Sequence, residues 1–303
     1  MSASPRPLAK GLWGVLATPF RGPQLDLDEC SLQREVSLFQ QIEATGVVAL
    51  GVFGEGAALD SVEQRRVVEV VCDDGRGLPV VVGVAALATA PAIEQVRRAV
   101  EAAGEQLAGV MVQVNSPHPD VLAAHLTAIH DATGAGIVLQ DYPVVSGVRI
   151  PVAHVLETVR QCPFVVAVKS EAPPTGRVIA ELTAGTSVPV FGGLGGVGLL
   201  DELAGGAAGA MTGFSRPEAL LEALRAWESG GMAAAHAAFA RWLPLANFEA
   251  QPGIGLALRK EALRLRGVFD EAAVRPPAPG VPEALRNTMR QHLEALQLME
   301  GIA

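Results

Sequence analysis

Residues 164–171 decide the fold of this chain, and they read Phe164-Val165-Val166-Ala167-Val168-Lys169-Ser170-Glu171. Five apolar residues in a row, three of them valine, predict a strand that is buried on both faces. Strands of this kind belong to parallel sheets that are covered by helices. Lys169 comes where such a strand leaves the core, so the stretch indicates both a fold class and a candidate reactive group.

Lys169 is a candidate for covalent chemistry because of this position. An ammonium beside apolar walls loses solvation, which favours the neutral amine. Neutral amines attack ketones, and the protonated imine that results is an electron sink for a carbanion on the neighbouring carbon. The alternative is a surface lysine that merely ends a strand. The rest of the chain has to decide between the two.

Composition excludes several classes of function. Half of the 303 residues are hydrophobic, and 23 basic residues stand against 32 acidic ones, which gives a formal charge of −9. This balance argues against nucleic acid and anionic membranes as partners. The longest apolar stretches have the length of strands, and the leader 1–10 lacks the apolar core of a signal peptide. We expect a soluble cytoplasmic protein.

Metal sites and disulfides are not expected. Cys30, Cys72 and Cys162 are scattered without paired spacing, which predicts buried thiols. The six histidines show no spacing typical of a metal site. We therefore expect neither a metal nor another cofactor.

Strands and helices alternate along most of the chain. Because valine-rich strands that alternate with helices demand a parallel sheet, eight such units predict an α/β fold, a (β/α)8 TIM barrel. The rival is an open, doubly wound sheet. The expected strands are residues 12–18, 47–52, 79–84, 110–114, 137–139, 164–168, 189–191 and 207–211.

Helix starts and the domain division follow from local signals. Asp28 or Ser31 can cap the first helix, and capping boxes are expected at Ser61 with Gln64 and at Ser215 with Glu218. Beyond Gly231 the pattern is purely helical. We expect a barrel over residues 1–231 and a C-terminal helical appendage, residues 232–303, packed on it.

Polar groups follow the ends of the expected strands, where the chemistry of a barrel gathers. Examples are Thr18 after the first strand, residues 54–56 after the second, residues 140–143 after the fifth and residues 192–198 after the seventh. They converge on the rim that holds Lys169. This convergence favours a functional lysine over a structural one.

Four of these stretches resemble a known family, the dihydrodipicolinate synthase and N-acetylneuraminate lyase superfamily of Schiff-base barrels. They are residues 14–20 (GVLATPF), residues 51–55 (GVFGE), the turn at Pro143 and the pair Val168-Lys169. The resemblance implies that Lys169 forms a Schiff base with a 2-oxo acid. It also implies a homo-oligomer, a tetramer or dimer of barrels. Finally, it implies that a backbone loop receives the substrate carboxylate, the loop being Val52, Phe53, Gly54 and Glu55.

The chain departs from the synthase pattern at two places. The usual Gly-Thr-Thr-Gly-Glu is residues 51–55 here, without either threonine, and the tyrosine three residues before Pro143 is Gln140. Glutamine cannot replace a tyrosine as an acid or a base. The turn Gln140-Asp141-x-Pro143 is instead similar to the 2-keto-3-deoxy-sugar-acid dehydratase branch, typified by L-2-keto-3-deoxyarabonate dehydratase.

The expected site has a catalytic and a binding part. Lys169, Glu171 and Gln140 are the candidate catalytic residues, although Glu171 can equally be a solvated loop charge. Glu55 acts either on substrate or as a cap for local backbone amides. The candidate substrate-binding residues are Val52, Phe53, Gly54, Glu55, Tyr142, Gly193 and Leu194.

Gly193 and Leu194 belong to a stretch, residues 193–198, that formally matches GxGxxG. A dinucleotide site needs this motif in the first βα unit of a Rossmann domain, but here it lies in the seventh unit. A loop whose backbone approaches the substrate closely, or a tight turn, is the better interpretation.

The leading hypothesis is therefore a lyase that dehydrates a 2-keto-3-deoxy sugar acid. A pyruvate-dependent aldolase or a dihydrodipicolinate-synthase-like condensing enzyme is the alternative on the same scaffold. From another class, the chain can be a non-catalytic barrel that binds a 2-oxo acid. The lysine favours covalent chemistry, because a sensor can hold a carboxylate with arginine or backbone amides.

Overall fold

Eight parallel strands form one sheet in the computed structural model, which describes residues 5–74 and 77–300. Their order across the sheet is β10-β1-β4-β5-β6-β7-β8-β9, as expected when each strand is followed by a covering helix. The strands are β1 (Gly11–Val15), β4 (Gly46–Ala49), β5 (Val80–Val84), β6 (Leu107–Gln113), β7 (Ile137–Asp141), β8 (Val165–Ser170), β9 (Val190–Phe191) and β10 (Gly209–Thr212).

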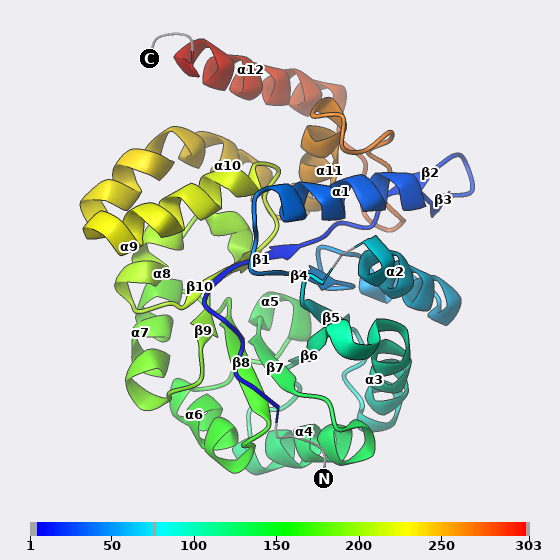
Figure 1. The fold of residues 1–303 in the computed structure, drawn as a ribbon, viewed down its shortest axis with the longest axis vertical. Helices are drawn as coiled ribbons and strands as arrows, with labels where there is room; N and C mark the ends of the chain where they lie inside the picture. The colour runs from blue at the N-terminus through cyan, green and yellow to red at the C-terminus, as the bar shows by residue number, and fades with distance from the viewer. Residues whose placement is uncertain (1–4, 75–76, 301–303) are drawn as a thin grey trace.

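The sheet closes on itself. β10 pairs with β1 along its length, and a parallel bridge between Gly192 and Ala210 joins β9 to β10. Figure 1 shows the ring of strands with helices around it. The predicted barrel is confirmed, and the open doubly wound sheet is wrong, because an open sheet has two unpaired edges.

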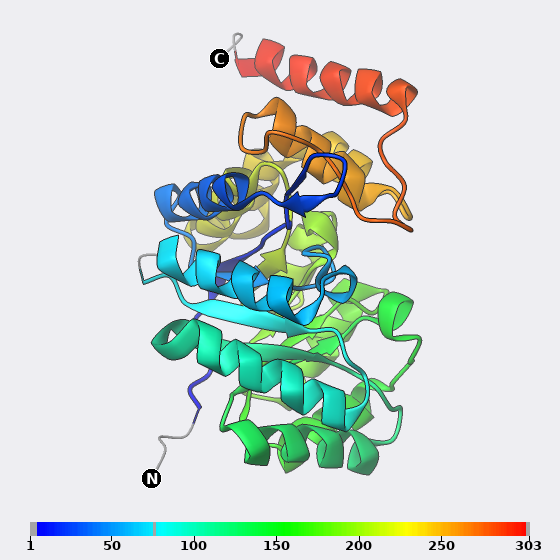
Figure 2. The same ribbon diagram turned by 90° about the vertical axis from the view of Figure 1, so that its right-hand side faces the viewer.

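Helices surround the ring and continue beyond it (Figures 1 and 2). The helices that follow barrel strands are α1 (Glu29–Gln41), α2 (Ser61–Asp74), α3 (Thr89–Ala103), α4 (Pro119–Thr133), α5 (Pro143–Ser146), α6 (Val152–Gln161), α7 (Thr175–Gly185), α8 (Leu199–Ala204) and α9 (Pro217–Phe239). The last helices are α10 (Leu243–Glu249), α11 (Gly255–Leu265) and α12 (Glu283–Glu300). Short 3-10 turns are η1 (Gly56–Ala58), η2 (Gly104–Gln106), η3 (Leu194–Gly196) and η4 (Ala240–Trp242).

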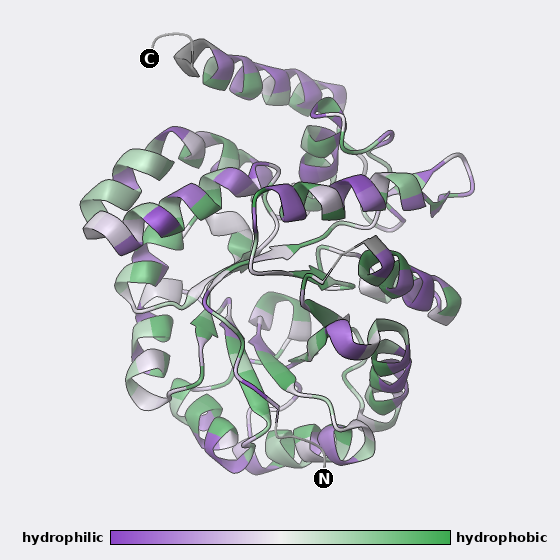
Figure 3. Ribbon diagram, viewed as in Figure 1, coloured by the Kyte–Doolittle hydropathy of each residue, from purple (hydrophilic) through white to green (hydrophobic). Residues whose placement is uncertain are grey.

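Two apolar clusters explain why the strands are hydrophobic on both faces. One fills the inside of the barrel and includes Trp13, Val81, Val138 and Phe191. The other, larger cluster packs the helices against the outside of the sheet. In Figure 3 the strands are accordingly green to white, whereas purple gathers on the helices. Because side chains fill the barrel, substrate has access only to its rim.

A small hairpin, β2 (Phe20–Arg21) with β3 (Asp26–Leu27), follows β1 and was not predicted. The helix starts agree only in part with expectation. Asp28 caps α1 by accepting from the Ser31 N–H at 3.1 Å, as one of the two predicted alternatives.

Both predicted capping boxes are wrong. At α2 the box lies one residue earlier: Asp60 accepts from the Glu63 N–H at 2.9 Å, and Glu63 accepts from the Asp60 N–H at 3.0 Å. The Ser215 hydroxyl donates instead to Glu249 of α10, so tertiary contact overrides the local signal. The prediction of buried thiols holds for Cys72 and Cys162, but Cys30 is exposed.

The C-terminal helices form layers at one end of the molecule (Figure 2). Gly231 has φ 63° and ψ −152° and breaks α9 at the residue where we expected the barrel to end. We propose this residue as the boundary between barrel and appendage. Residues 1–4 of the leader and 301–303 of the appendage lie outside the described residues. Within the described part, no helix is long and apolar enough to cross a membrane.

Candidate active site

Lys169 lies near the end of β8 and is 6% exposed. Residues 165–168 before it are buried, which places the amine at the top of the packed barrel interior. Its Nζ lies 3.2 Å from Oε2 of Glu171, which is also buried. An ammonium that leaves water needs such a partner, so two of the three candidate catalytic residues are neighbours.

Glu171 receives hydrogen bonds from two further groups. The Gln140 amide donates from Nε2 to Oε2 at 2.7 Å, and the Leu194 N–H donates to Oε1 at 3.2 Å. These contacts, together with Lys169, fix both carboxylate oxygens. The three predicted catalytic residues and Leu194 are thus brought together.

The loop after β9 is shaped around this carboxylate. A Cβ on Gly193 would collide with Oε1 of Glu171. Leu194 and Gly195 have positive φ values of 49° and 73°, and the Gly195 N–H donates to the Thr212 hydroxyl oxygen at 2.8 Å. The GxGxxG-like stretch therefore brings backbone up to Glu171. Glycine is required in this turn because a Cβ at Gly193 would meet Glu171 and because Gly195 has a positive φ.

The loop after β4 lies across the rim. Leu50 and Glu55 at its ends have positive φ values, 57° and 53°, which are uncommon for residues with a Cβ and cluster at functional sites. The Thr18 hydroxyl donates to the Gly54 carbonyl at 2.6 Å and holds the loop down. No hydrogen bond within residues 5–74 and 77–300 uses the N–H groups of Phe53 and Gly54. These two amides are available to an anion.

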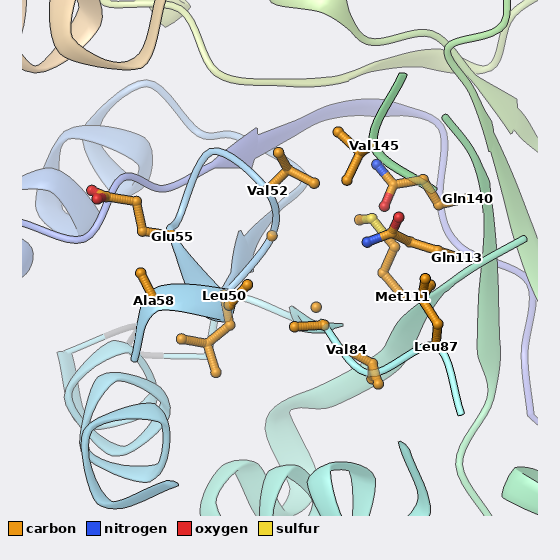
Figure 4. Close-up of a pocket in the computed structure, with 14 residues that line it drawn as sticks. Leu50, Val52, Glu55, Ala58, Val84, Leu87, Met111, Gln113, Gln140 and Val145 are labelled. Carbon is orange, nitrogen blue, oxygen red and sulfur yellow. The ribbon is translucent and has the colours of Figure 1, made fainter. Parts of the chain in front are cut away.

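The Glu55 side chain does not point to the substrate region. Its carboxylate pairs with the ammonium of Lys260, a fully buried residue of α11, and accepts from the Arg275 N–H at 2.9 Å. Figure 4 shows the carboxylate directed away from the cavity. The sequence left open whether Glu55 acts on substrate or caps local backbone amides. The geometry favours a structural role, but the groups that Glu55 holds belong to the C-terminal segment and not to its own loop.

A cavity of about 330 Å³ extends from Gln140 to the loop after β4. Figure 4 shows its aliphatic walls, which include Leu50, Val52, Val84, Leu87, Met111 and Val145. Lys169 is not among the residues that line it. The cavity ends at Gln140, whose amide holds Glu171 against the lysine. Cavities of this size accommodate small organic ligands.

The comparisons with known proteins fit this geometry. The family model described as the dihydrodipicolinate synthetase family matches residues 8–296. The chain belongs to this family. The predicted resemblance is confirmed, and with it an enzyme family of lyases that use a TIM barrel.

Family members with different names are similar to this chain. The 4-hydroxy-tetrahydrodipicolinate synthase of Acidiphilium cryptum is 31% identical over 90% of this chain and 94% of its own length. The L-2-keto-3-deoxyarabonate dehydratase of Azospirillum brasilense is 28% identical over 92% of each chain. Among solved structures, dihydrodipicolinate synthase from Rhodopseudomonas palustris is similar, with a TM-score of 0.89, 28% identity and coverage of 97% of this chain and 100% of that one.

Tyr142 and Asp141 complete the family turn after β7. Tyr142 is half-buried, and burial together with the charge of Glu171 raises its pKa. Asp141 is buried, and burial raises its pKa to about 6, with the charge of Glu171 acting in the same direction. Both residues therefore lie within the electrostatic field of the carboxylate that pairs with Lys169.

Sequence reasoning missed Arg259 of α11. Its guanidinium lies over the Phe53 ring, 5.1 Å from the centroid, and 3.8 Å from Glu249. Burial lowers its pKa, whereas the charges of Glu249 and Glu171 oppose this change. The residue brings positive charge from the C-terminal helices to the rim of the barrel. No local pattern marks it, because its partners are remote in sequence.

Glu202 and Gln113 were missed as well. Glu202 of α8 is buried behind Gly192, and burial raises its pKa to about 7. Gln113 ends β6 and lines the cavity. The expected end of that strand was a usable signal for Gln113, since residues at strand ends face the rim. Among the described residues, no group of three or more histidine, cysteine or acidic side chains is arranged to hold a metal ion.

Proposed function

We propose that this chain is a Schiff-base lyase that removes water from a 2-keto-3-deoxy sugar acid such as L-2-keto-3-deoxyarabonate. The observation that carries the proposal is the contact of Glu171 with both the Lys169 amine and the Gln140 amide. A carboxylate that can move protons adjoins the nucleophile, whereas the position expected for a tyrosine holds an amide that cannot.

The reaction begins when the neutral Lys169 amine attacks the C2 ketone and water leaves, which gives a protonated imine. Glu171 takes a proton from C3, and the pair of electrons forms an enamine. The enamine then expels the C4 hydroxyl, which departs as water with the proton that Glu171 carries. The unsaturated imine tautomerises so that C5 becomes the aldehyde carbon. Hydrolysis frees the product and the amine, and the net change is the loss of one water.

The substrate carboxylate is assigned to the loop after β4. The N–H groups of Phe53 and Gly54, which have no hydrogen-bond partner among the described residues, support this assignment, because successive amides in a turn attract anions. Val52 and Phe53 offer no hydroxyl, so the backbone has to supply these hydrogen bonds. Tyr142, Gly193 and Leu194 are assigned to the substrate region on the strength of their position around Glu171.

Elimination is favoured over aldol cleavage by Gln140. Cleavage requires a base that takes the proton from the C4 hydroxyl, and a neutral amide orients a hydroxyl without deprotonating it. The similarity to a relative named L-2-keto-3-deoxyarabonate dehydratase supports the same choice. Other relatives are named 4-hydroxy-tetrahydrodipicolinate synthase, so a condensing enzyme is the second candidate.

Product analysis tests the proposal. The protein is incubated with 2-keto-3-deoxyarabonate, and 2-oxoglutarate semialdehyde is the expected product. Pyruvate with glycolaldehyde contradicts dehydration and supports an aldolase. A parallel assay for 4-hydroxy-tetrahydrodipicolinate tests the condensing enzyme. If borohydride traps an adduct but none of these products forms, the chain is a non-catalytic barrel that binds 2-oxo acids.

We further infer that the protein is a cytoplasmic homo-oligomer, either a dimer or a tetramer. Exposed aliphatic side chains near the rim support association, since Val144 is 78% and Leu87 41% exposed. Light scattering on the purified protein measures the number of subunits directly.

A further inference from the structure

Gln113 is a buried polar side chain that the proposed reaction does not yet use. It is 8% exposed and lines the cavity. Its Oε1 has no hydrogen-bond partner among the described residues. Burying an amide without a partner is unfavourable, and buried polar groups without partners commonly meet a ligand or an ordered water.

Gln113 belongs to a row of side chains that begins at the reactive amine. Gln113 on β6 is in register with Gln140 on β7, which is in register with Lys169 on β8. Neighbouring strands are about 4.8 Å apart, so the three residues stand side by side at one level of the barrel. Figure 4 shows the two amides together at the wall of the cavity.

The two amides differ in which of their atoms already have hydrogen-bond partners. Gln140 donates its Nε2 hydrogen to Glu171, which leaves its Oε1 for another donor. Gln113 has an unpartnered Oε1. A hydroxyl both donates and accepts hydrogen bonds. Two hydroxyls on neighbouring carbons therefore match two amides on neighbouring strands.

The other walls of the cavity limit what else the substrate carries. Aliphatic groups such as Leu50, Val84 and Met111 offer no hydrogen bonds to a further hydroxyl. Among the described residues, no lysine, arginine or histidine lines the cavity. A second carboxylate at the far end of the substrate would lie against these aliphatic side chains without a cation, which is unfavourable.

We propose that Gln113 and Gln140 form a subsite for two neighbouring hydroxyl groups, with Gln140 at C4 and Gln113 at C5 of a 2-oxo acid bound to Lys169. The inference rests on the proposed function, because the Schiff base anchors C2. It narrows the substrate class to short 2-oxo acids with hydroxyls at C4 and C5 and no second charged group. Gln113 becomes the residue that selects for the terminal hydroxyl.

The test measures borohydride trapping, which needs no turnover. Pyruvate, 4-hydroxy-2-oxopentanoate and 4,5-dihydroxy-2-oxopentanoate, which is the proposed substrate 2-keto-3-deoxyarabonate, are each titrated against the full-length protein. Adducts are counted by mass, and those that have lost water are counted together with those that have not. The wild type should reach half-maximal trapping at about tenfold lower concentration with the dihydroxy acid than with the monohydroxy acid. In Gln113→Met, which keeps the volume but removes the amide, this difference should fall to less than about twofold.

Controls separate the possible outcomes. Gln161→Met changes an exposed glutamine of α6 and should trap like the wild type. Normal trapping of pyruvate by Gln113→Met shows that this variant is folded. If Gln113→Met does not trap pyruvate, Gln113→Asn is used in its place, because its shorter side chain withdraws the amide from the cavity. Equal trapping of the two hydroxy acids by the wild type, or an unchanged difference in the variant, overturns the subsite alone. If no 2-oxo acid is trapped, the Schiff base itself is wrong and the subsite falls with it.

Discussion

The Glu171 carboxylate lies 3.2 Å from the Lys169 ammonium and accepts a hydrogen bond from Gln140 through the same oxygen. An ammonium has to lose a proton before it attacks a ketone. Glu171 is in position to take that proton, and in the proposed reaction the same carboxylate then acts on the carbon next to the imine. One side chain can therefore serve both the formation of the covalent intermediate and the chemistry that follows.

Replacing Lys169 with alanine or arginine should abolish turnover without loss of the fold. Arginine keeps the charge but stays protonated and does not attack a carbonyl. Borohydride trapping with pyruvate, read by peptide mass, should find no adduct in either variant. Lys10→Ala removes an exposed lysine and is the control. An adduct that persists in Lys169→Ala would place the Schiff base elsewhere.

Glu171→Gln should slow turnover by roughly 10²–10⁴-fold, the usual contribution of a general acid or base. Trapping of pyruvate should persist, because the amine remains, although the imine should form more slowly without the carboxylate that takes the proton from Lys169. Steady-state rates and trapping on the same preparation measure the two effects. Glu181→Gln, at an exposed position on α7, is the matched control. Unchanged turnover in Glu171→Gln would remove this residue from the mechanism.

Gly193→Ala should act as an indirect mutation of Glu171. The new Cβ would collide with Oε1, so the carboxylate has to move away from Lys169 and Gln140. We expect a loss of turnover of about the same size as in Glu171→Gln, roughly 10²-fold or more, with a normal circular dichroism spectrum. Gly280→Ala, where a Cβ meets no atom within 4 Å, is the control. Full activity in Gly193→Ala would show that the exact place of the carboxylate is unimportant.

Val52→Thr combined with Phe53→Thr restores the two hydroxyls of the synthase pattern. Because we assign the carboxylate to backbone N–H groups, the concentration of pyruvate for half-maximal trapping should change by less than about tenfold, the value of a typical hydrogen bond. No efficient synthesis of 4-hydroxy-tetrahydrodipicolinate should appear. Efficient synthesis would mean that these two residues alone separate the activities.

Glu35 should make stability depend on pH. Burial raises its pKa to about 8 from the ordinary 4.5, against opposing effects of the Ala17 N–H and Lys260. The folded chain thus keeps a proton that the unfolded chain releases. Stability falls as pH rises from 4.5 to about 8, by at most about 1.4 kcal/mol per pH unit.

Glu35→Gln removes this titration, so its free energy of unfolding should change less between pH 5 and pH 8 than that of the wild type. Urea unfolding at the two pH values measures the difference. Glu43→Gln, which is exposed, should behave like the wild type. An equal pH dependence in Glu35→Gln and wild type would show that Glu35 is ionised in the folded protein.

The barrel could be predicted because its signal is repeated. Each buried strand is an apolar run, and every expected strand has its counterpart around the ring. The strand at 137–139 was drawn too short, since Gln140 and Asp141 are polar yet continue the ladder with β8. The hairpin of β2 and β3 has only two residues in each strand. Strands this short show no repeating pattern of apolar and polar residues from which they could be predicted.

The grouping of Lys169, Glu171 and Gln140 could be anticipated, since all three lie at or just beyond the ends of neighbouring strands. The roles of Glu55 and Arg259 could not. Glu55 meets a lysine 205 positions away, and Arg259 reaches Phe53 from a helix whose local pattern is only amphipathic. Contacts of this kind depend on how the C-terminal helices dock, which no short window of sequence records.

The ion pair between Glu55 and Lys260 has a consequence for protein engineering. A chimaera of two TIM-barrel enzymes can be joined at a helix break such as Gly231, so that the barrel of one enzyme carries the C-terminal helices of the other. Here a graft that replaces the residues after that break also deletes the cation that neutralises Glu55. Leaving one charge of a buried pair alone typically costs about 3–5 kcal/mol. The grafted C-terminal segment therefore has to place a lysine of its own beside Glu55, as Lys260 does here. Otherwise Glu55 has to be replaced by a neutral residue in the same step.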